Sequence, residues 1–158
     1  MAILERASDR LRLLQEVRTV AMVGASSNPS RASNFVATYL RGKTPWTVYY
    51  VNPRETEIFG QPVYPSLADL PEVPDLVDVF RRAEDLPSVV ADAIAVGAPA
   101  VWFQLGLVND EAAEKAAAAG LDVVQNRCLK IEHARFAGGL HCVGFDTGVI
   151  DSRKSALI

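Results

Sequence analysis

The sequence predicts an α/β fold, a single domain with a mainly parallel sheet of about five strands flanked by helices. Short apolar, β-branched segments alternate with helical segments roughly every 20–30 residues, the pattern of βαβ units. Crossovers of that kind are right-handed and make the strands parallel. The 158 residues fit one domain, and a hydrophobic content of 49% is enough for a sizeable core. The expected strands are residues 20–23, 47–51, 76–80, 100–103 and 121–125.

Apolar residues at helical spacing predict an N-terminal helix within residues 1–17. Leu4, Leu11 and Leu14 share one side with Val17, while arginines and glutamates occupy the other side. Such an amphipathic helix buries its apolar side against another element. We therefore expect it to cover one face or edge of the sheet.

Residues 20–40, VAMVGASSNPSRASNFVATYL, predict a strand, a tight turn at Gly24 and a helix. If the strand is parallel and buried, the turn lies at the carboxyl edge of the sheet, where open α/β folds bind their ligands. The loop offers backbone N–H groups, several hydroxyls and the positive end of a helix dipole. We expect an anion site here, most simply a site for phosphate.

The turn departs from the dinucleotide-binding fingerprint G-x-G-x-x-G, because no second glycine follows Gly24. Ala25 and Ser26 are small enough to let a ligand approach the backbone closely. A branched side chain at Gly24 is expected to block that approach and to leave the chain folded. Arg31 adds a fixed positive charge with forked geometry. The alternative is that Ser30 or Ser33 only caps the helix and that Arg31 is solvated surface.

The second strand, residues 47–51, ends at Asn52, Pro53 and Arg54. NAD-binding folds place an acidic residue near this point to bind the ribose hydroxyls. Here the acid is missing and a cation is close, which favours a phosphorylated ribose. Glu55 lies nearby and weakens this argument without cancelling it.

Residues 57–64 indicate a short excursion, a hairpin or an edge piece of the sheet. The next strand, residues 76–80, ends at a pair of arginines. Asp85 is expected to cap the following helix, with Pro87 in its first turn and Gly97 at its end.

Gln104 follows the strand of residues 100–103. Asn109 is expected to cap an alanine-rich helix that Gly120 terminates. After the last strand, residues 128–136 indicate a short helix, and residues 137–158 an extended arm.

The expected strand order is 3-2-1-4-5, that of a Rossmann half-fold. In this order the third strand, residues 76–80, lies beside the second strand. The carboxyl ends of all the strands then meet along one crevice. Residues that are far apart in the sequence are thereby grouped into one candidate site.

The composition excludes several classes of function. A net charge of −3 implies no general attraction to nucleic acid or to an anionic membrane. No apolar run is long enough to span a bilayer, and the N-terminus lacks a signal-peptide pattern, so we expect a cytoplasmic protein. The spacing of Cys128, Cys142, His133 and His141 resembles no structural zinc site.

The sequence indicates no convincing nucleophile–base pair. Cys128 follows the last strand, so it is either a thiol that reacts with a ligand's sulfhydryl or a small buried hydrophobe. Glu132 and His133 could serve proton transfer, but adjacent residues on a helix point apart. For this pair a structural or surface role is the better interpretation.

Four motifs together point to a known family: VAMVGASSNPSRASNFVATYL, YYVNPRETEIFGQPVYPSLADLP, DLVDVFRRAEDLP and AVWFQLGLVNDEAAEKAAAAGLDVVQNRCLKIEHAR. Over about residues 20–135 the chain resembles the stand-alone proteins of the CoA-binding domain family. It is also similar to the N-terminal domain of the succinyl-CoA synthetase alpha subunit. The resemblance implies a Rossmann-type domain that binds coenzyme A with its phosphates at the first βα turn.

The resemblance also implies roles for residues at the strand ends. The first loop would cradle the pyrophosphate, Arg31 would reach a phosphate, and Arg54 is the candidate for the 3′-phosphate. Neither histidine lies in a setting like the synthetase's phosphohistidine loop, and the second domain is absent, so that catalysis does not carry over. The implied CoA-binding residues are Gly24, Ala25, Ser26, Ser27, Arg31, Asn52, Pro53, Arg54, Phe80, Arg81 and Gln104.

The leading hypothesis is a non-catalytic module that holds CoA or acyl-CoA, with a possible protein partner in acyl-CoA metabolism. The alternative is an enzyme, either a small NAD(P)-dependent oxidoreductase or an acyl-transferring component of an acyl-CoA synthetase complex. The missing second glycine and the missing ribose acid count against NAD. A third hypothesis is a structural subunit with a vestigial nucleotide site.

Overall fold

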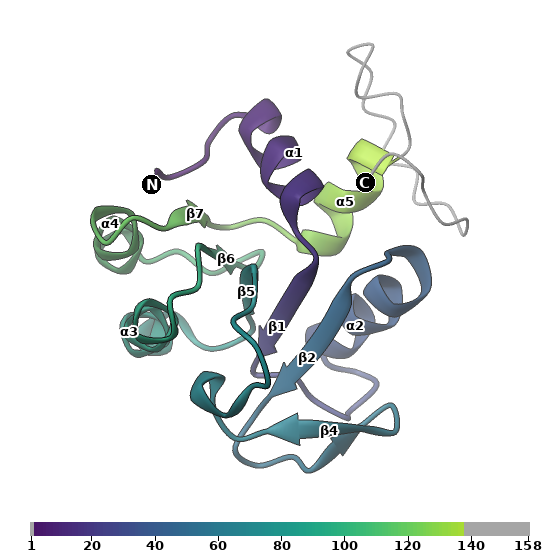
Figure 1. Ribbon diagram of the computed structural model, residues 1–158. Helices are drawn as coiled ribbons and strands as arrows, with labels where there is room; N and C mark the ends of the chain where they lie inside the picture. The colour runs from purple at the N-terminus through teal and green to yellow at the C-terminus, as the bar shows by residue number, and fades with distance from the viewer. Residues whose placement is uncertain (1, 138–158) are drawn as a thin grey trace.

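A twisted sheet runs through the middle of the molecule, as the computed structural model, which describes residues 2–137, shows (Figure 1). Its strands lie in the order β3-β4-β2-β1-β5-β6-β7. All neighbours are parallel except β3 and β4, which are antiparallel. The predicted α/β class is thus confirmed, with more strands than expected. The strands are β1 Thr19–Val23, β2 Thr47–Val51, β3 Glu57–Ile58, β4 Gln61–Tyr64, β5 Leu76–Val79, β6 Ala100–Phe103 and β7 Asp122–Val124.

Helices cover both faces of the sheet. On one face, α1, α2 and α5 pack over a core that contains Met22 and Trp102. On the other face, α3 and α4 pack over a core that contains Val77 and Phe103. Burial on both sides explains why the central strands are continuous apolar runs in the sequence. The helices are α1 Ala7–Glu16, α2 Ala32–Lys43, α3 Leu86–Val96, α4 Asp110–Ala118 and α5 Leu129–Ala137, with 3-10 turns at Leu67–Asp69 and Ala83–Asp85.

The predicted strand order is wrong at one position. β5 pairs with β1, not with β2, as the register of Val77 beside Ala21 shows. The place beside β2 is taken by β4, whose Val63 pairs with Tyr50. The predicted hairpin at residues 57–64 is confirmed, and it forms the edge of the sheet. Its strands are too short, and too interrupted by Pro62, to have counted as strands of the sheet in the sequence.

Two helix starts differ in how well the sequence predicted them. Asn109 caps α4 as expected, because its Oδ1 accepts a hydrogen bond from the Ala112 N–H at 3.0 Å. Asp85 occupies the N-cap position of α3, but its side chain makes no capping hydrogen bond. The Asp85 carboxylate instead lies 3.6 Å from Arg81 and 3.7 Å from Arg82. The predicted cap is therefore wrong in mechanism, because two arginines compete for the carboxylate.

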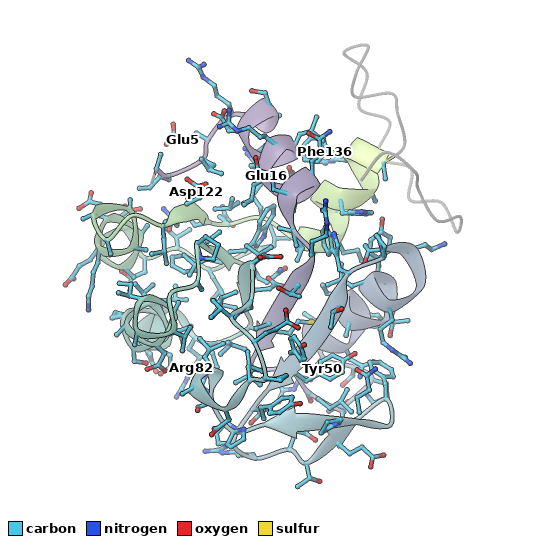
Figure 2. The ribbon with its side chains drawn as sticks, in the orientation of Figure 1. Glu5, Glu16, Tyr50, Arg82, Asp122 and Phe136 are labelled. Atoms are coloured by element: carbon cyan, nitrogen blue, oxygen red, sulfur yellow. The ribbon has the colours of Figure 1, made fainter. Side chains whose placement is uncertain are left out.

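The amino and carboxyl ends of the parallel strands lie at opposite ends of the molecule. In Figure 2, Tyr50 near the end of β2 and Arg82 after β5 label the lower end, which is the carboxyl edge. Glu16 at the end of α1 and Asp122 at the start of β7 label the upper end, which is the amino edge. The predicted C-terminal arm, residues 137–158, lies outside the described residues except for Ala137, which ends α5. The candidate site therefore has to be built from the loops at the carboxyl edge.

Candidate functional site

A cleft of about 740 Å³ lies along the carboxyl edge of the sheet. The ends of β1, β2, β5 and β6 and the start of α2 all contribute to its lining, as parallel strands require. All the predicted site residues line this cleft except Ala25 and Ser27. Those in the lining are Gly24, Ser26, Arg31, Asn52, Pro53, Arg54, Phe80, Arg81 and Gln104.

The turn at Gly24 depends on glycine for two reasons. Its φ is +87°, which side chains rarely adopt, and an added Cβ would lie 2.5 Å from the Phe80 carbonyl oxygen. The Gly24 N–H also donates to the Val51 carbonyl at 2.8 Å, which ties the turn to β2. A valine at this position would therefore strain the junction of three strands. This corrects the expectation that Gly24→Val affects only the ligand.

The loop after β1 is held by side-chain amides. Asn52 Nδ2 donates to the Ala25 carbonyl at 2.8 Å, and Asn34 Nδ2 donates to the Ser26 carbonyl at 3.1 Å. Asn52 Oδ1 in turn accepts from the Arg54 N–H at 2.9 Å. Asn52 therefore joins the ends of β1 and β2, and it places the Arg54 backbone at the rim of the cleft.

Ala25 and Ser27 lie outside the cleft lining for different reasons. Ala25 is buried under the turn, where it belongs to the hydrophobic core. Ser27 faces Glu55, whose Oε1 accepts from the Ser27 N–H at 3.1 Å and from its hydroxyl at 3.0 Å. The donors of Ser27 are thus already used by a carboxylate. Assignment of this residue to a phosphate requires Glu55 to move.

Helix α2 begins at the cleft without a side-chain cap. Its N-cap residue, Arg31, makes no capping hydrogen bond, and the first two helical residues, Ala32 and Ser33, line the cleft. The Ser33 hydroxyl accepts from the Ser26 N–H at 3.1 Å, and the Ser30 hydroxyl donates to Asn28 at 2.8 Å. The alternative that one of these serines caps the helix is therefore wrong. Backbone N–H groups of an uncapped first turn can bind an anion.

The arginines of the cleft fall into two groups. Arg81 and Arg82 share the carboxylate of Asp85, and Arg82 also lies 3.3 Å from Glu84. Arg31 and Arg54 form no ion pair with any residue in the described part of the chain. Two arginines without a carboxylate partner in residues 2–137 thus line the cleft.

Gln104, a predicted site residue that lines the cleft, forms a buried polar pair with Asp78, which the sequence analysis did not single out. Asp78 is completely buried on β5, and its carboxyl accepts a short hydrogen bond from the Gln104 side chain. Burial raises the pKa of Asp78 to about 8, although the hydrogen bond from Gln104 works in the opposite direction. An acidic residue inside an otherwise apolar strand was the available signal. At neutral pH this carboxyl is mostly protonated.

Other residues of the cleft were not predicted as binding residues. Arg82 and Leu105 belong to strand ends that the sequence placed at the crevice, but neither was given a binding role. Asp85 was identified only as a helix cap. Leu107 lies in a loop whose path the sequence does not define.

Cys128 and His133 lie away from the cleft lining. Cys128 is half-buried against the core, and burial raises the pKa of its thiol. His133 is fully buried, its Nδ1 lies 2.9 Å from the Tyr39 hydroxyl, and burial lowers its pKa to about 4. Glu132 pairs with Arg10 at 2.9 Å instead of with His133. These contacts favour structural roles for Glu132 and His133.

Two further kinds of feature are absent from the part of the chain that the structure describes. No cluster of histidine, cysteine and carboxylate side chains among residues 2–137 could hold a metal ion. Within the same residues, no helix has the length and apolar character needed to cross a bilayer.

Comparisons with known proteins cover most of the chain. The family model described as the CoA binding domain matches residues 18–134, which include every strand and the whole cleft. The chain is 35% identical to the Bacillus subtilis protein YneT over 122 residues, 77% of this chain and 90% of that protein. A structure of a protein from Pyrococcus horikoshii superimposes with a TM-score of 0.77 at 40% identity, covering 82% of this chain and 91% of that one.

A larger relative contains a domain of the same kind. The chain is 29% identical over 130 residues to an ADP-forming acetate–CoA ligase of Archaeoglobus fulgidus. The match includes 76% of this chain but only 19% of the ligase. The chain therefore spans about a fifth of that enzyme. Because the family model covers most of the chain, the chain belongs to the CoA-binding domain family.

Proposed function

We propose that this protein is a non-catalytic module that binds CoA or acyl-CoA in the cleft at the carboxyl edge. The observation that carries the proposal is the pair of arginines, Arg31 and Arg54, which face the cleft without a carboxylate partner in residues 2–137. Exposed cations that line one cleft together with the uncapped start of a helix match a ligand with several phosphates. CoA carries a pyrophosphate and a separate 3′-phosphate.

Each part of the ligand has a matching part of the cleft. The pyrophosphate is assigned to Gly24, Ser26 and the first turn of α2, with Arg31 beside it. The 3′-phosphate is assigned to Arg54, which stands where NAD-binding folds have an acidic residue. The role of Ala25 is limited to its backbone, and Ser27 contributes only if Glu55 releases it.

Two observations support CoA over a nicotinamide cofactor. The strand end at Asn52 and Pro53 offers no carboxylate for a ribose diol, and Glu55 is turned toward Ser27. The relationship to an acetate–CoA ligase points to the same ligand chemistry. The missing carboxylate counts against NAD, whereas Arg54 would suit the phosphorylated ribose of NADP as well as that of CoA.

Catalysis by the isolated chain has no support from the cleft geometry. Its lining contains no cysteine or histidine, and Glu132 and His133 have separate partners. We therefore expect no hydrolysis or transfer when the pure protein is incubated with acetyl-CoA or succinyl-CoA, with or without ATP. Steady turnover that a cleft substitution abolishes would instead support the acyl-transferring alternative. A cytoplasmic location and a protein partner in acyl-CoA metabolism remain part of the proposal.

Native mass spectrometry of protein purified from its own cells tests the proposal directly. We expect a mass increase that corresponds to one CoA or acyl-CoA, lost in the double variant Arg31→Ala/Arg54→Ala. Arg12→Ala is the matched control, because Arg12 is an exposed arginine of α1 whose ion pair with Asp9 lies outside the cleft. An adduct with the mass of NAD(P) or FAD would contradict the proposal.

A further inference from the structure

The charge of the residues that line the cleft changes along the strand order, from the end of β2 to the end of β6. Arg31 and Arg54 come from α2 and the end of β2. Gln104, Leu105 and Leu107 follow β6, which lies two strands beyond β1 in the order β2-β1-β5-β6. Arg81, Arg82 and Asp85 follow β5 between these two groups and pair with one another. The cleft therefore has unpaired cations near β2 and uncharged residues at the end of β6. A ligand that fits both sides has phosphates at one end and a neutral arm at the other.

Gln104 is the polar group of the uncharged side. It is buried to 6% exposure although it lines the cleft. Its Nε2 donates to Asp78 Oδ1, which directs the nitrogen of the carboxamide toward the core. Within residues 2–137 no group donates a hydrogen bond to its Oε1. The Gln104 nitrogen is thus already hydrogen-bonded, whereas its oxygen is available to accept a hydrogen bond.

Asp78 is the group that holds this orientation. Its neighbours in register on the same face are Met22 on β1 and Trp102 on β6, whose indole N–H donates to the Arg127 carbonyl and not to Asp78. Asp78 Oδ1 accepts from Gln104, while Oδ2 is buried without a hydrogen-bond partner among the described residues. A buried carboxyl in apolar surroundings is kept neutral, so it adds no negative charge beside a phosphate site.

We propose that Asp78 is a positioning residue, which holds the Gln104 carboxamide so that its oxygen accepts an N–H from the neutral arm of the bound ligand. The inference rests on the proposed function, since in CoA that arm is the pantetheine chain with its two amides. A secondary amide supplies the N–H that the unused oxygen needs. Leu105 and Leu107 pack against the methylene groups between the amides. The uncharged side of the cleft thereby selects for the arm, and the cationic side for the phosphates.

The test compares CoA with adenosine 3′,5′-bisphosphate, which keeps the nucleoside and two phosphates but lacks the arm. Calorimetric titrations are made with the full-length protein and with Gln104→Met, Asp78→Val and Asp78→Asn. Gln104→Met keeps the length of the side chain and removes the carboxamide. Asp78→Val removes the group that orients Gln104, and Asp78→Asn keeps an acceptor oxygen without a charge.

We expect Gln104→Met and Asp78→Val to bind CoA about tenfold more weakly and the bisphosphate within about twofold of wild type. Asp78→Asn should restore CoA binding, which a general packing defect would not do. If Asp78→Val does not fold, the CoA affinities of Gln104→Met and Asp78→Asn still test the inference, because only the first variant should bind CoA more weakly.

Three results would overturn the inference alone. These are equal affinities of the wild-type protein for CoA and the bisphosphate, equal losses of both ligands in Gln104→Met, and a loss in Asp78→Asn as large as that in Gln104→Met. Failure of the wild-type protein to bind either ligand would overturn the proposed function, and with it this inference.

Discussion

The contact between α1 and α5 and the cleft at the carboxyl edge both gather arginines, but two of the four cleft arginines have no carboxylate partner among the described residues. At the helix contact, Arg10 Nε lies 2.9 Å from Glu132 Oε2, and the side chains are 6% and 4% exposed. Arg127 and Arg135 approach the other oxygen of Glu132 at 3.6 and 3.5 Å. The helix contact therefore has an internal partner for its cations.

At the cleft, two arginines lack such a carboxylate partner. Arg31 and Arg54 are exposed and have no carboxylate within residues 2–137, although Glu55 follows Arg54 directly. The structure turns Glu55 toward Ser27 instead. A cluster of arginines therefore does not by itself mark a binding site. The proposed site rests instead on the missing partner, because an unpaired cation beside a cleft is available to a ligand.

The largest expected effect is on stability at the helix contact. Glu132→Leu should lower the free energy of unfolding by about 3–5 kcal/mol, because it leaves Arg10 buried without its counter-charge. The double variant Arg10→Met/Glu132→Leu should recover most of that loss. Urea denaturation measures both. A loss below about 1 kcal/mol in the single variant, or a double variant as unstable as the single one, would contradict this structural role.

A smaller effect is expected from Asp78, whose pKa burial raises from 3.8 to about 8. Between these values the unfolded chain has lost the proton and the folded chain has kept it. The stability that this group contributes is complete below pH 3.8 and falls by about 1.4 kcal/mol per pH unit as the pH rises toward 8. An asparagine side chain does not titrate. The free energy of unfolding of Asp78→Asn, relative to that of wild type, should therefore increase by about 2–3 kcal/mol from pH 5 to pH 7.

Denaturation of both proteins across this pH range measures the gain. His133, whose pKa burial lowers to about 4, has the opposite pH dependence, but it titrates in both proteins and cancels from the difference. A difference in stability that does not change with pH would mean that Asp78 is ionised in the folded protein at neutral pH.

The smallest expected change in free energy is at the cleft. Arg54→Ala should weaken CoA binding by about 1.5–3 kcal/mol, which is tenfold or more, and it should change stability by less than about 0.5 kcal/mol. Dephospho-CoA should lose much less affinity, because it lacks the phosphate assigned to Arg54. Calorimetry of both ligands tests this contact, with Arg12→Ala as the control. Equal losses of affinity for the two ligands would contradict the assignment of the 3′-phosphate to Arg54.

Much of the fold followed from local patterns in the sequence. The unit of strand, Gly24 turn and helix α2 was predicted because the apolar run, the glycine and the helical spacing agree with one another. The cap at Asn109 was predicted because capping depends on near neighbours only. The strand order was wrong because pairing of β5 with β1 or β2 is decided by long-range packing, to which the short β4 gave no visible signal.

The candidate site was less accessible to sequence reasoning than the fold. Strand ends identified most of the cleft lining, because parallel strands bring their carboxyl ends together. The binding roles of those residues remain predictions. The direction in which Glu55 turns, and the contact between Asp78 and Gln104, depend on side chains that are 28 and 26 residues apart from their partners. Such pairs have no signature in one sequence.

A calorimetric titration of the wild-type protein with CoA, dephospho-CoA and NAD is the most direct test of the proposed CoA site. We expect that CoA binds with one site per chain, that dephospho-CoA binds about tenfold or more weakly, and that NAD binds more weakly than CoA. Absence of CoA binding, or an affinity for NAD that equals or exceeds the affinity for CoA, would contradict the proposal.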